Sequence, residues 1–471
     1  MTPRLAVIGG GIAGLAAAHR LLELAQAAGR HIEVRLLEGG ARPGGVIATE
    51  RRDGFVVELG PDSFLSEKPA ALALCERLDI TARLVGTREE YRRTYVVHRG
   101  RLHPLPDGFL LMAPTRFWPL VTTPLFSWPG KLRMALDLVL PRGGGGGDES
   151  LSSFVTRRLG REALERVAQP LVGGIYTADP ARLSLAATMP RFLEMERRER
   201  SIVRAMWRQQ RQAARREGSG ARWSLFLSFD QGLECLVDAL ARRLPEGALR
   251  CGRPVRGLAR HADGAWQLDD GELADGVLIA TPAPAAAALL RPLDVALGAE
   301  LDAIPYASSV TVTLAFRRED IPHPLDGFGF VVPHVEGRAL LAGTFSSLKY
   351  PGRAPDAAVL LRAFVGGALR PELVELDDAA LLRSVRRELG ELLGITGEPL
   401  LTRIARWPRA MPQYQVGHLE RVDRIRARGA ALGLFLAGNA YEGVGIPDCI
   451  RSGERAAEAL FATLGPRDAA A

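Results

Sequence analysis

The chain has 471 residues, of which 47% are hydrophobic, and a formal net charge of +7. This length exceeds what one hydrophobic core normally serves, and it predicts two or three domains. Four cysteines without a C-x-x-C pair, eight histidines without an H-x-x-x-H or H-E-x-x-H motif, and no basic run interleaved with aromatics argue against a disulfide framework, a metal site and a nucleic-acid partner.

The first predicted elements are a strand over residues 5–8, a glycine turn and a helix over residues 15–28. The turn has the spacing G-x-G-x-x-G, with its glycines at positions 9, 11 and 14. The first glycine allows the turn, the second lets a pyrophosphate approach the backbone, and the third lets the helix pack on the strand. Free N–H groups at the helix N-terminus suit phosphates. The stretch therefore predicts a dinucleotide site formed by Gly9, Gly10, Gly11, Ile12, Ala13 and Gly14.

A second strand is expected over residues 32–37, and it ends at Glu38. A carboxylate at this point accepts hydrogen bonds from ribose hydroxyls and would repel a 2′-phosphate, which argues against NADP. Arg42 and the glycine pair that follows it complete an E-x-x-x-R-x-G-G pattern, which recurs in flavoproteins. A third strand is expected over residues 55–59, and a Gly-Pro turn ends it.

The middle of the chain changes character. A short hairpin is expected over residues 95–102, and residues 109–140 are dense in large apolar side chains and broken by prolines. Two interpretations of this second segment stay open: an interfacial membrane-binding segment with cations at the lipid headgroups, or a packed core or substrate channel wall. Charged helices are then expected over residues 161–216, with a glycine pair at Gly173-Gly174.

From residue 226 onward, strands and helices alternate again, with strands expected over residues 255–258 and 276–282. Further strands and one helix predict a sheet with helices on one face: 309–316, 328–332, 339–345, 359–365 and the helix 379–393. A last strand over residues 434–439 leads through a glycine turn into a helix. The N-terminus of that helix would face the pyrimidine ring of a flavin and favour its anionic reduced form.

With these features the chain resembles the amine oxidase-like flavoprotein superfamily. Within it, the chain is similar to the oxygen-dependent, FAD-containing protoporphyrinogen oxidase family, whose bacterial branch includes enzymes that prefer coproporphyrinogen III. The similar segments are Glu58-Leu59-Gly60-Pro61, Gly174-Ile175-Tyr176, Gly327-Phe328-Gly329-Phe330, Met411-Pro412-Gln413-Tyr414 with Gly417-His418, and Gly438-Asn439-Ala440-Tyr441-Glu442-Gly443-Val444. They follow the family's order along essentially the whole chain.

The resemblance implies an α/β fold, an α+β composite of three domains. A Rossmann-type FAD-binding domain would comprise residues 1–85, 226–290 and 408–471. A mixed-sheet substrate domain would comprise residues 291–407, and a mostly helical, membrane-associated domain residues 86–225.

The resemblance also implies a reaction. FAD would oxidise CH–CH bonds of a porphyrinogen to give the porphyrin in haem biosynthesis, with oxygen as electron acceptor and hydrogen peroxide as product. Protoporphyrinogen IX is the first expected substrate and coproporphyrinogen III is the alternative. No side chain is expected to be catalytic, because flavin N5 takes the hydride.

Site residues are implied by position. Besides the glycine turn, the expected FAD contacts are Glu38, Gly39, Arg42, Gly45, Val46, Gly60, Pro61, Val255, Trp407, Gly438, Val444, Gly445 and Ile446. Arg93 would pair with a substrate propionate, since a guanidinium binds a carboxylate in a bidentate manner, and Gly174 would lie beside the substrate plane. Val331 and Phe364 would sandwich a pyrrole. Plainer alternatives are a surface charge for Arg93 and ordinary strand core for the two apolar residues.

One departure from the family affects the choice of substrate. Gly173 stands where some members have an arginine, so a second propionate partner is either missing or supplied elsewhere. The number of propionates bound, and with it the choice between the two porphyrinogens, stays open.

Two other functions also stay open. A different flavin amine oxidase or desaturase would use a lysine near flavin N5, and Lys349 is the candidate because it falls in the predicted substrate sheet. A non-catalytic flavoprotein or tetrapyrrole carrier would bind porphyrin without forming peroxide.

The family resemblance further implies a cytoplasmic protein, peripheral on the inner face of the cell membrane. We expect no signal peptide and no spanning helix. Expected partners are the porphyrinogen, oxygen, a ferrochelatase that receives the product and a second copy of the chain in a homodimer.

Overall fold

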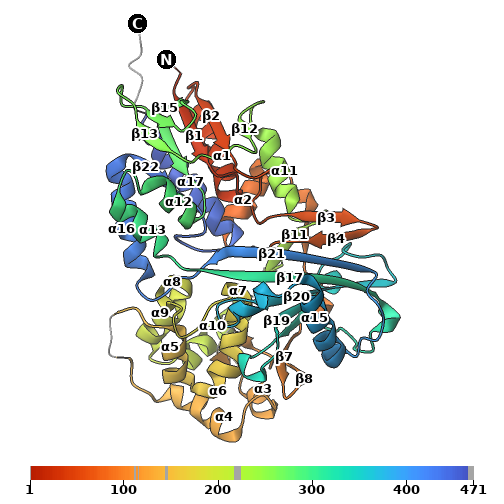
Figure 1. Cartoon of the computed structure of the whole chain (residues 1–471). Coiled ribbons are helices and arrows are strands. Elements are labelled where there is room, and N and C mark those ends of the chain that lie inside the picture. Colours follow the sequence, from red (N-terminus) through yellow and green to blue (C-terminus); the bar gives the residue numbers. More distant parts are fainter. Residues whose placement is uncertain (1, 111–112, 115, 144–146, 217–223, 465–471) are drawn as a thin grey trace.

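The computed structural model describes residues 2–110, 113–114, 116–143, 147–216 and 224–464. Figure 1 shows three regions along its vertical axis: a parallel sheet with its helices at the top, a long-stranded sheet across the middle, and helices at the bottom. The expected mixed α/β architecture is confirmed. Among the described residues, no helix has the length and apolar character needed to cross a membrane.

A five-stranded parallel sheet forms the upper region. Its strands, in spatial order, are β12 (Leu249–Arg250), β2 (Glu33–Leu37), β1 (Arg4–Ile8), β16 (Gly276–Ile279) and β22 (Leu434–Leu436). The central strands are apolar on both faces, as helix-covered parallel strands require. Strands from both ends of the sequence thus lie in one sheet.

Helices cover both faces of this sheet. One face packs against α1 (Ile12–Ala27), α2 (Pro69–Arg77), α11 (Glu234–Arg243) and α17 (Ile446–Ala462). The other packs against α12 (Ala283–Leu290), α13 (Val295–Asp302), α16 (His418–Leu432) and the small sheet of β13 (Leu258–Arg260), β14 (Trp266–Leu268) and β15 (Leu273–Ala274). The strand expected over residues 255–258 was wrong in its bounds, because β13 begins only at Leu258.

A seven-stranded mixed sheet crosses the middle. Its spatial order is β21 (Leu401–Pro412), β17 (Tyr306–Arg317), β20 (Ala358–Gly366), β19 (Leu340–Phe345), β18 (Gly329–Val331), β7 (Thr94–His98) and β8 (Arg101–Pro104). The predicted hairpin over residues 95–102 is confirmed as β7–β8. Because β7 pairs in parallel with β18, this sheet extends beyond residues 291–407 and takes two strands from the stretch expected to be helical.

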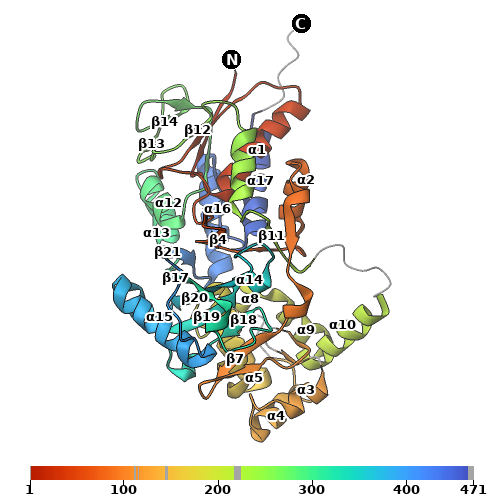
Figure 2. The same cartoon turned by 90° about the vertical axis from the view of Figure 1, so that its right-hand side faces the viewer.

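The mixed sheet lies between helix α15 on one side and a lobe of several helices on the other (Figure 2). One face packs against α15 (Asp378–Leu393). Val96, Val331 and Ala342 of the other face pack into the core of the helical lobe. That lobe contains α3 (Phe117–Thr122), α4 (Trp128–Ala135), α5 (Leu151–Leu159), α6 (Arg161–Ala163), the π-helix η4 (Leu164–Ala168), α7 (Gln169–Tyr176), α8 (Leu185–Thr188), α9 (Pro190–Glu199) and α10 (Ile202–Arg216).

Short elements complete the chain. They are the ribbon β3 (Thr49–Arg52) with β4 (Phe55–Glu58), the small sheet of β5 (Phe64–Leu65), β11 (Phe226–Phe229) and β6 (Leu84–Gly86), the pair β9 (Phe109–Leu110) and β10 (Ala113–Pro114), and α14 (Ser346–Lys349). Short 3₁₀ turns are η1 (Thr81–Arg83), η2 (Glu89–Tyr91), η3 (Leu136–Leu138), η5 (Arg318–Asp320), η6 (His334–Glu336) and η7 (Pro371–Glu375).

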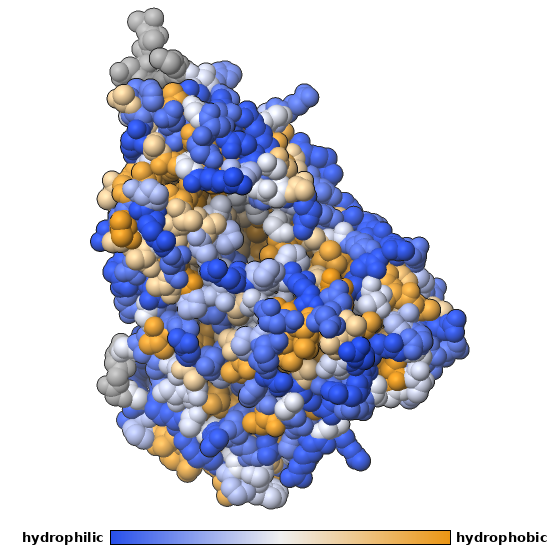
Figure 3. All heavy atoms as spheres, in the orientation of Figure 1, coloured by the Kyte–Doolittle hydropathy of each residue, from blue (hydrophilic) through white to orange (hydrophobic). Residues whose placement is uncertain are grey.

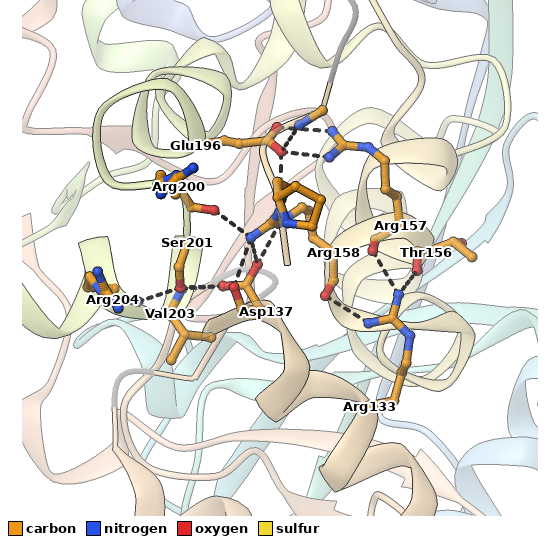
Figure 4. A network of polar contacts seen from close by, with 12 residues as sticks. Arg133, Asp137, Thr156, Arg157, Arg158, Glu196, Arg200, Ser201, Val203 and Arg204 are labelled. Carbon is orange, nitrogen blue, oxygen red and sulfur yellow. Dashed lines mark hydrogen bonds and ion pairs between the residues drawn. The ribbon is translucent and has the colours of Figure 1, made fainter. Parts of the chain in front are cut away.

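A buried ion pair connects three elements of the helical lobe (Figure 4). The Arg158 guanidinium of α5 donates to the Asp137 carboxylate of η3 at 2.6 Å, and neither side chain is exposed to solvent. Asp137 also accepts hydrogen bonds from Ser201 Oγ at 2.6 Å and from the Val203 N–H at 3.0 Å. The pair thus joins η3 to α5 and to the start of α10, and its remaining hydrogen-bonding capacity is satisfied as burial demands.

Candidate functional site

The glycine turn after β1 forms a cradle with open space above it. Gly9 has a φ of +107° and lies against the Ala280 carbonyl, while a Cβ on Gly14 would lie 3.1 Å from the carbonyl carbon of Gly9. A Cβ on Gly11 would meet nothing within 4 Å. Gly11 is also the N-cap of α1 and offers no side-chain hydrogen bond. The turn thus leaves free N–H groups at a helix N-terminus, which is the environment that binds phosphate.

Glu38 closes one side of this cradle. Its carboxylate accepts the Gly10 N–H and the Gly40 N–H, each at 2.6 Å. The acidic side chain at the end of β2 is therefore fixed beside the glycine turn, as the sequence predicts for a ribose-binding residue. Gly39 follows Glu38, and an ideal Cβ on Gly39 would lie 3.4 Å from the Pro254 Cβ. Val255, which is half-buried, is the residue after Pro254.

The predicted loop over residues 42–46 lies on the cradle. The Gly44 N–H donates to the Gly10 carbonyl at 2.8 Å. An ideal Cβ on Gly45 would lie 3.5 Å from Gly11 Cα. Arg42 donates to the carbonyls of Ile47 at 2.8 Å and Gly45 at 2.9 Å. The Arg42 guanidinium therefore shapes its own loop, a role that the sequence did not reveal.

A second helix N-terminus comes from the other end of the chain. Gly445 is the N-cap of α17 and, like Gly11, has no side-chain cap, and Val444 and Ile446 flank it. A Cβ on Gly438 would meet nothing within 4 Å. Helix α17 crosses α1 closely, because a Cβ on Gly453 would lie 3.0 Å from the Ala13 carbonyl carbon. Two uncapped helix N-termini therefore belong to helices that pack side by side (Figures 1 and 2).

The turn after β4 connects this region to the mixed sheet. The Leu59 carbonyl accepts hydrogen bonds from Trp407 Nε1 at 2.8 Å and Thr311 Oγ1 at 3.1 Å. A Cβ on Gly60 would lie 2.8 Å from the Val46 carbonyl carbon, so the turn packs tightly on the loop over residues 42–46. Trp407 thus lies at the turn that contains Gly60 and half-buried Pro61.

One row of residues crosses the mixed sheet from this turn to helix α7. Thr311 pairs with Phe364, Phe364 with Ala342, and Ala342 with Val331. Directly paired residues point to the same face of a sheet. The Val331 side chain then lies 4.0 Å from an ideal Cβ on Gly174. Three of the four predicted substrate residues, Gly174, Val331 and Phe364, therefore form one apolar group.

Arg93 lies apart from this row. It precedes β7 by one residue, and its guanidinium donates to Asp326 at 2.7 Å. The Tyr95 hydroxyl donates to the same carboxylate at 2.5 Å. Burial, with Asp326 next, raises the pKa of Tyr95 to about 12. Since Val96 is in register with Val331, alternation sends residues 93 and 95 to the opposite face of the strand.

Two carboxylates near the turn after β4, buried Glu58 and half-buried Asp62, are paired with cations. Asp62 pairs with Lys349 at 3.0 Å; although burial opposes it, the nearby Lys349 and Arg362 hold the pKa of Asp62 well below its usual range. Glu58 lies 3.8 Å from Arg353, and burial raises its pKa. Lys349, the candidate amine-oxidase lysine, is thus engaged by Asp62.

The C-terminal glycine turn has a support that sequence reasoning missed. The Tyr414 hydroxyl donates to the Asn439 carbonyl at 2.5 Å and accepts the Gly443 N–H at 2.8 Å. Its ring stacks on His418 at 4.0 Å between centroids. His418 is 1% exposed, and burial lowers its pKa to about 4. Tyr414 and His418 both lie in a segment that resembles the family, and that resemblance was the one sign in the sequence that they contribute to the site.

An extended dinucleotide fits these residues. The open space over Gly11 and the uncapped start of α1 offer an anion site, and Glu38 lies between backbone donors at the ribose position. The uncapped start of α17 adds backbone donors, and the Asp448 carboxylate in its first turn is paired with Lys68 and Arg451. Fold and site together define a flavin-dependent oxidoreductase. The chain belongs to the family described as Flavin containing amine oxidoreductase, whose model matches residues 12–461, and FAD is its cofactor.

Comparison with individual proteins narrows the relationship. The chain is 35% identical to the coproporphyrinogen III oxidase of Bacillus subtilis, with 96% of each chain covered. It is 38% identical to the enzyme of that name from Propionibacterium freudenreichii, covering 97% of this chain and 90% of the relative. A solved structure from Exiguobacterium sp. 255-15, assigned as a protoporphyrinogen oxidase, aligns with a TM-score of 0.86 at 33% identity over 98% of this chain and 99% of that one.

Proposed function

We propose that this protein oxidises a porphyrinogen to the porphyrin in haem biosynthesis, with oxygen as the electron acceptor and hydrogen peroxide as the product. The observation that supports this most directly is the row from Thr311 to Val331, which leads from the Leu59–Gly60 turn to Gly174. The apolar members of this row, Phe364, Ala342 and Val331, suit a flat macrocycle. The bound FAD supplies the two-electron acceptor, and the near full-length similarity to porphyrinogen oxidases specifies the class of substrate.

In this proposal, the chain's residues bind and orient. The glycine cradle and Glu38 hold the dinucleotide, Trp407 and Thr311 fix the Leu59 carbonyl, and Phe364 and Val331 lie against the macrocycle. Arg93 remains a proposed carboxylate partner because its side chain is 66% exposed, although it lies on the face opposite the Val331 row. A propionate there would compete with Asp326, so Arg93→Met would raise KM more than it lowers kcat.

Coproporphyrinogen III is the first candidate substrate, because both bacterial relatives described above are named for it. Protoporphyrinogen IX is the second, supported by the name of the Exiguobacterium protein. The test is kcat/KM for each substrate, followed by porphyrin fluorescence. Turnover of neither substrate by the FAD-loaded protein would refute the proposal.

We further propose peripheral membrane contact through one edge of the helical lobe. Part of the segment over residues 109–140 is core, since Phe126 and Met134 are buried. Other side chains face solvent: Trp118, Trp128, Leu132, Leu136 and Val139 are between 48% and 77% exposed. Lys131 lies 4.8 Å from the Trp128 ring centroid. Orange side chains are visible at this lower end in Figure 3.

Apolar residues with an adjacent cation suit the boundary of an anionic bilayer. The double variant Trp128→Ser and Leu132→Ser should lose co-sedimentation with anionic vesicles while keeping porphyrinogen oxidation. Equal sedimentation of variant and parent would contradict this contact. From the family resemblance we also propose a location on the inner face of the membrane, handover to a ferrochelatase and homodimer formation. The proposed three-domain division is kept at residues 1–85, 226–290 and 408–471 for FAD, 291–407 for substrate and 86–225 for the helical domain, which contributes β7 and β8 to the mixed sheet.

A further inference from the structure

Arg362 is a cation in the interior of an apolar strand. It lies in β20, two residues before Phe364, and is 4% exposed. Its neighbours across the sheet are Thr313 and Thr344. Residues two apart on a strand share a face, and the Arg362 guanidinium indeed lies 4.9 Å from the Phe364 ring centroid. The charge therefore stands on the face that bears the proposed substrate row.

The contacts of Arg362 leave part of its hydrogen-bonding capacity unused. One terminal nitrogen donates to the Gly60 carbonyl and lies 3.3 Å from the Leu59 carbonyl. Its Nε is buried and has no partner in the part of the chain that the structure describes. A buried donor without a partner costs free energy of folding. This donor lies beside the Leu59–Gly60 turn, and Gly60 and the neighbouring Trp407 are proposed flavin contacts.

Arg362 also makes no direct ion pair. Across the described ranges, no carboxylate lies within ion-pair distance of it; the acids that act on its charge from farther away, Asp62 and Glu58, are engaged by Lys349 at 3.0 Å and Arg353 at 3.8 Å. Three cations face two carboxylates, which leaves one positive charge in excess. Burial lowers the pKa of Arg362, but a guanidinium stays protonated in proteins.

A buried cation without a direct ion pair, in a group with one positive charge in excess, favours an anionic partner from outside the chain. A bound flavin would acquire a negative charge on reduction, because a hydride carries two electrons and one proton to a neutral ring. The backbone carbonyls that anchor Arg362 belong to the turn proposed to contact the flavin. We propose that Arg362 is the residue that stabilises the negative charge of the reduced flavin.

This inference rests on the proposed flavin site but not on the identity of the substrate. It is tested on the FAD-loaded full chain without porphyrinogen. Arg362→Gln removes the charge and keeps N–H donors for the Gly60 carbonyl, whereas Arg362→Lys keeps the charge. Arg406→Gln is the matched control, because Arg406 lies in β21 of the same sheet and also donates to backbone carbonyls, those of Val374 and Leu376.

Two readouts report the charge: the midpoint potential of the flavin, measured against a reference dye, and the affinity for sulfite, which forms an anionic adduct with flavin. For Arg362→Gln we expect the ratio of reduced to oxidised flavin at fixed potential to fall by at least about tenfold, or about 30 mV for a two-electron couple. Sulfite affinity should fall by a similar factor. Arg362→Lys and Arg406→Gln should stay within about threefold of the parent, well inside that step.

A parental potential and sulfite affinity in Arg362→Gln would overturn the inference. If Arg362→Gln does not retain flavin, Arg362→Lys decides: a potential near that of the parent supports the proposal, and a fall of about tenfold in the ratio contradicts it. Failure of the unmodified chain to bind FAD would instead refute the proposed function.

Discussion

Replacing Gly453 by alanine tests how the two ends of the chain build one cofactor site. Gly453 lies in α17, where the helix crosses α1, and a Cβ there would be 3.0 Å from the Ala13 carbonyl carbon and closer still to its oxygen. Carbon atoms normally approach to about 3.5–4.0 Å. Helix α17 must therefore retreat from α1, and it takes the Gly445 N-cap with it.

The cost of this change follows from packing. Inserting one methyl group into a tight contact costs about 1–3 kcal/mol. If binding FAD restores the native spacing, the same amount is lost from affinity, which is about a five- to 150-fold rise in Kd. The assay is flavin-fluorescence titration of the apoprotein, with thermal unfolding in parallel.

Gly429→Ala is the matched control for this prediction. Gly429 is a buried glycine in α16, but its nearest neighbour would be the Leu434 carbonyl oxygen at 3.4 Å from the new Cβ, an ordinary contact. This variant should bind FAD like the parent and gain helix propensity. Parental FAD affinity in Gly453→Ala would refute the argument that the α1–α17 crossing positions the two helix N-termini.

Three further predictions address other parts of the molecule. Arg158→Met leaves Asp137 buried without its cation and should cost about 3–5 kcal/mol in urea unfolding; the double variant with Asp137→Leu should recover part of this, and equal losses would contradict the ion-pair account. Burial lowers the pKa of His418 from its ordinary 6.5 to about 4 on folding. The contribution of His418 to the free energy of unfolding, about 3 kcal/mol, is therefore present above pH 6.5 and lost as the pH falls toward 4. Stability of His418→Gln should decline less across that window, and identical pH profiles would exclude this role. Glu38→Ala removes the proposed ribose acceptor and should weaken FAD binding by about ten- to 150-fold. A parental Kd in fluorescence titration would contradict the ribose role and leave Glu38 only its hydrogen bonds to the Gly10 and Gly40 N–H groups.

Local features of the site could be predicted from the sequence. The glycine spacing, the strand before it and the helix after it lie within one short stretch, and Glu38 follows by strand length alone. The geometry of the glycine turn and of Glu38 depends on residues that are close in sequence, so the sequence pattern is sufficient to predict it. The family resemblance supplied the distant parts, such as Trp407 and the turn after Gly438, which periodicity cannot connect to the glycine cradle.

Long-range pairing could not be predicted in the same way. Strands β7 and β8 join the mixed sheet through a parallel pairing with β18, and no local signal specifies that partner. The same pairing directs Arg93 toward Asp326 and away from the Val331 row. Arg362 did leave a signal, since an arginine within an otherwise apolar strand is anomalous, but its contact with the Gly60 turn depends on the tertiary structure.

The central claim is that a flavin bound at the N-termini of α1 and α17 receives electrons from a porphyrinogen lying on the mixed sheet. Anaerobic mixing of the FAD-loaded protein with coproporphyrinogen III tests it most directly. The yellow flavin absorbance should bleach as porphyrin fluorescence rises, and oxygen should restore the colour with release of hydrogen peroxide. A flavin that stays oxidised with both coproporphyrinogen III and protoporphyrinogen IX would contradict the account.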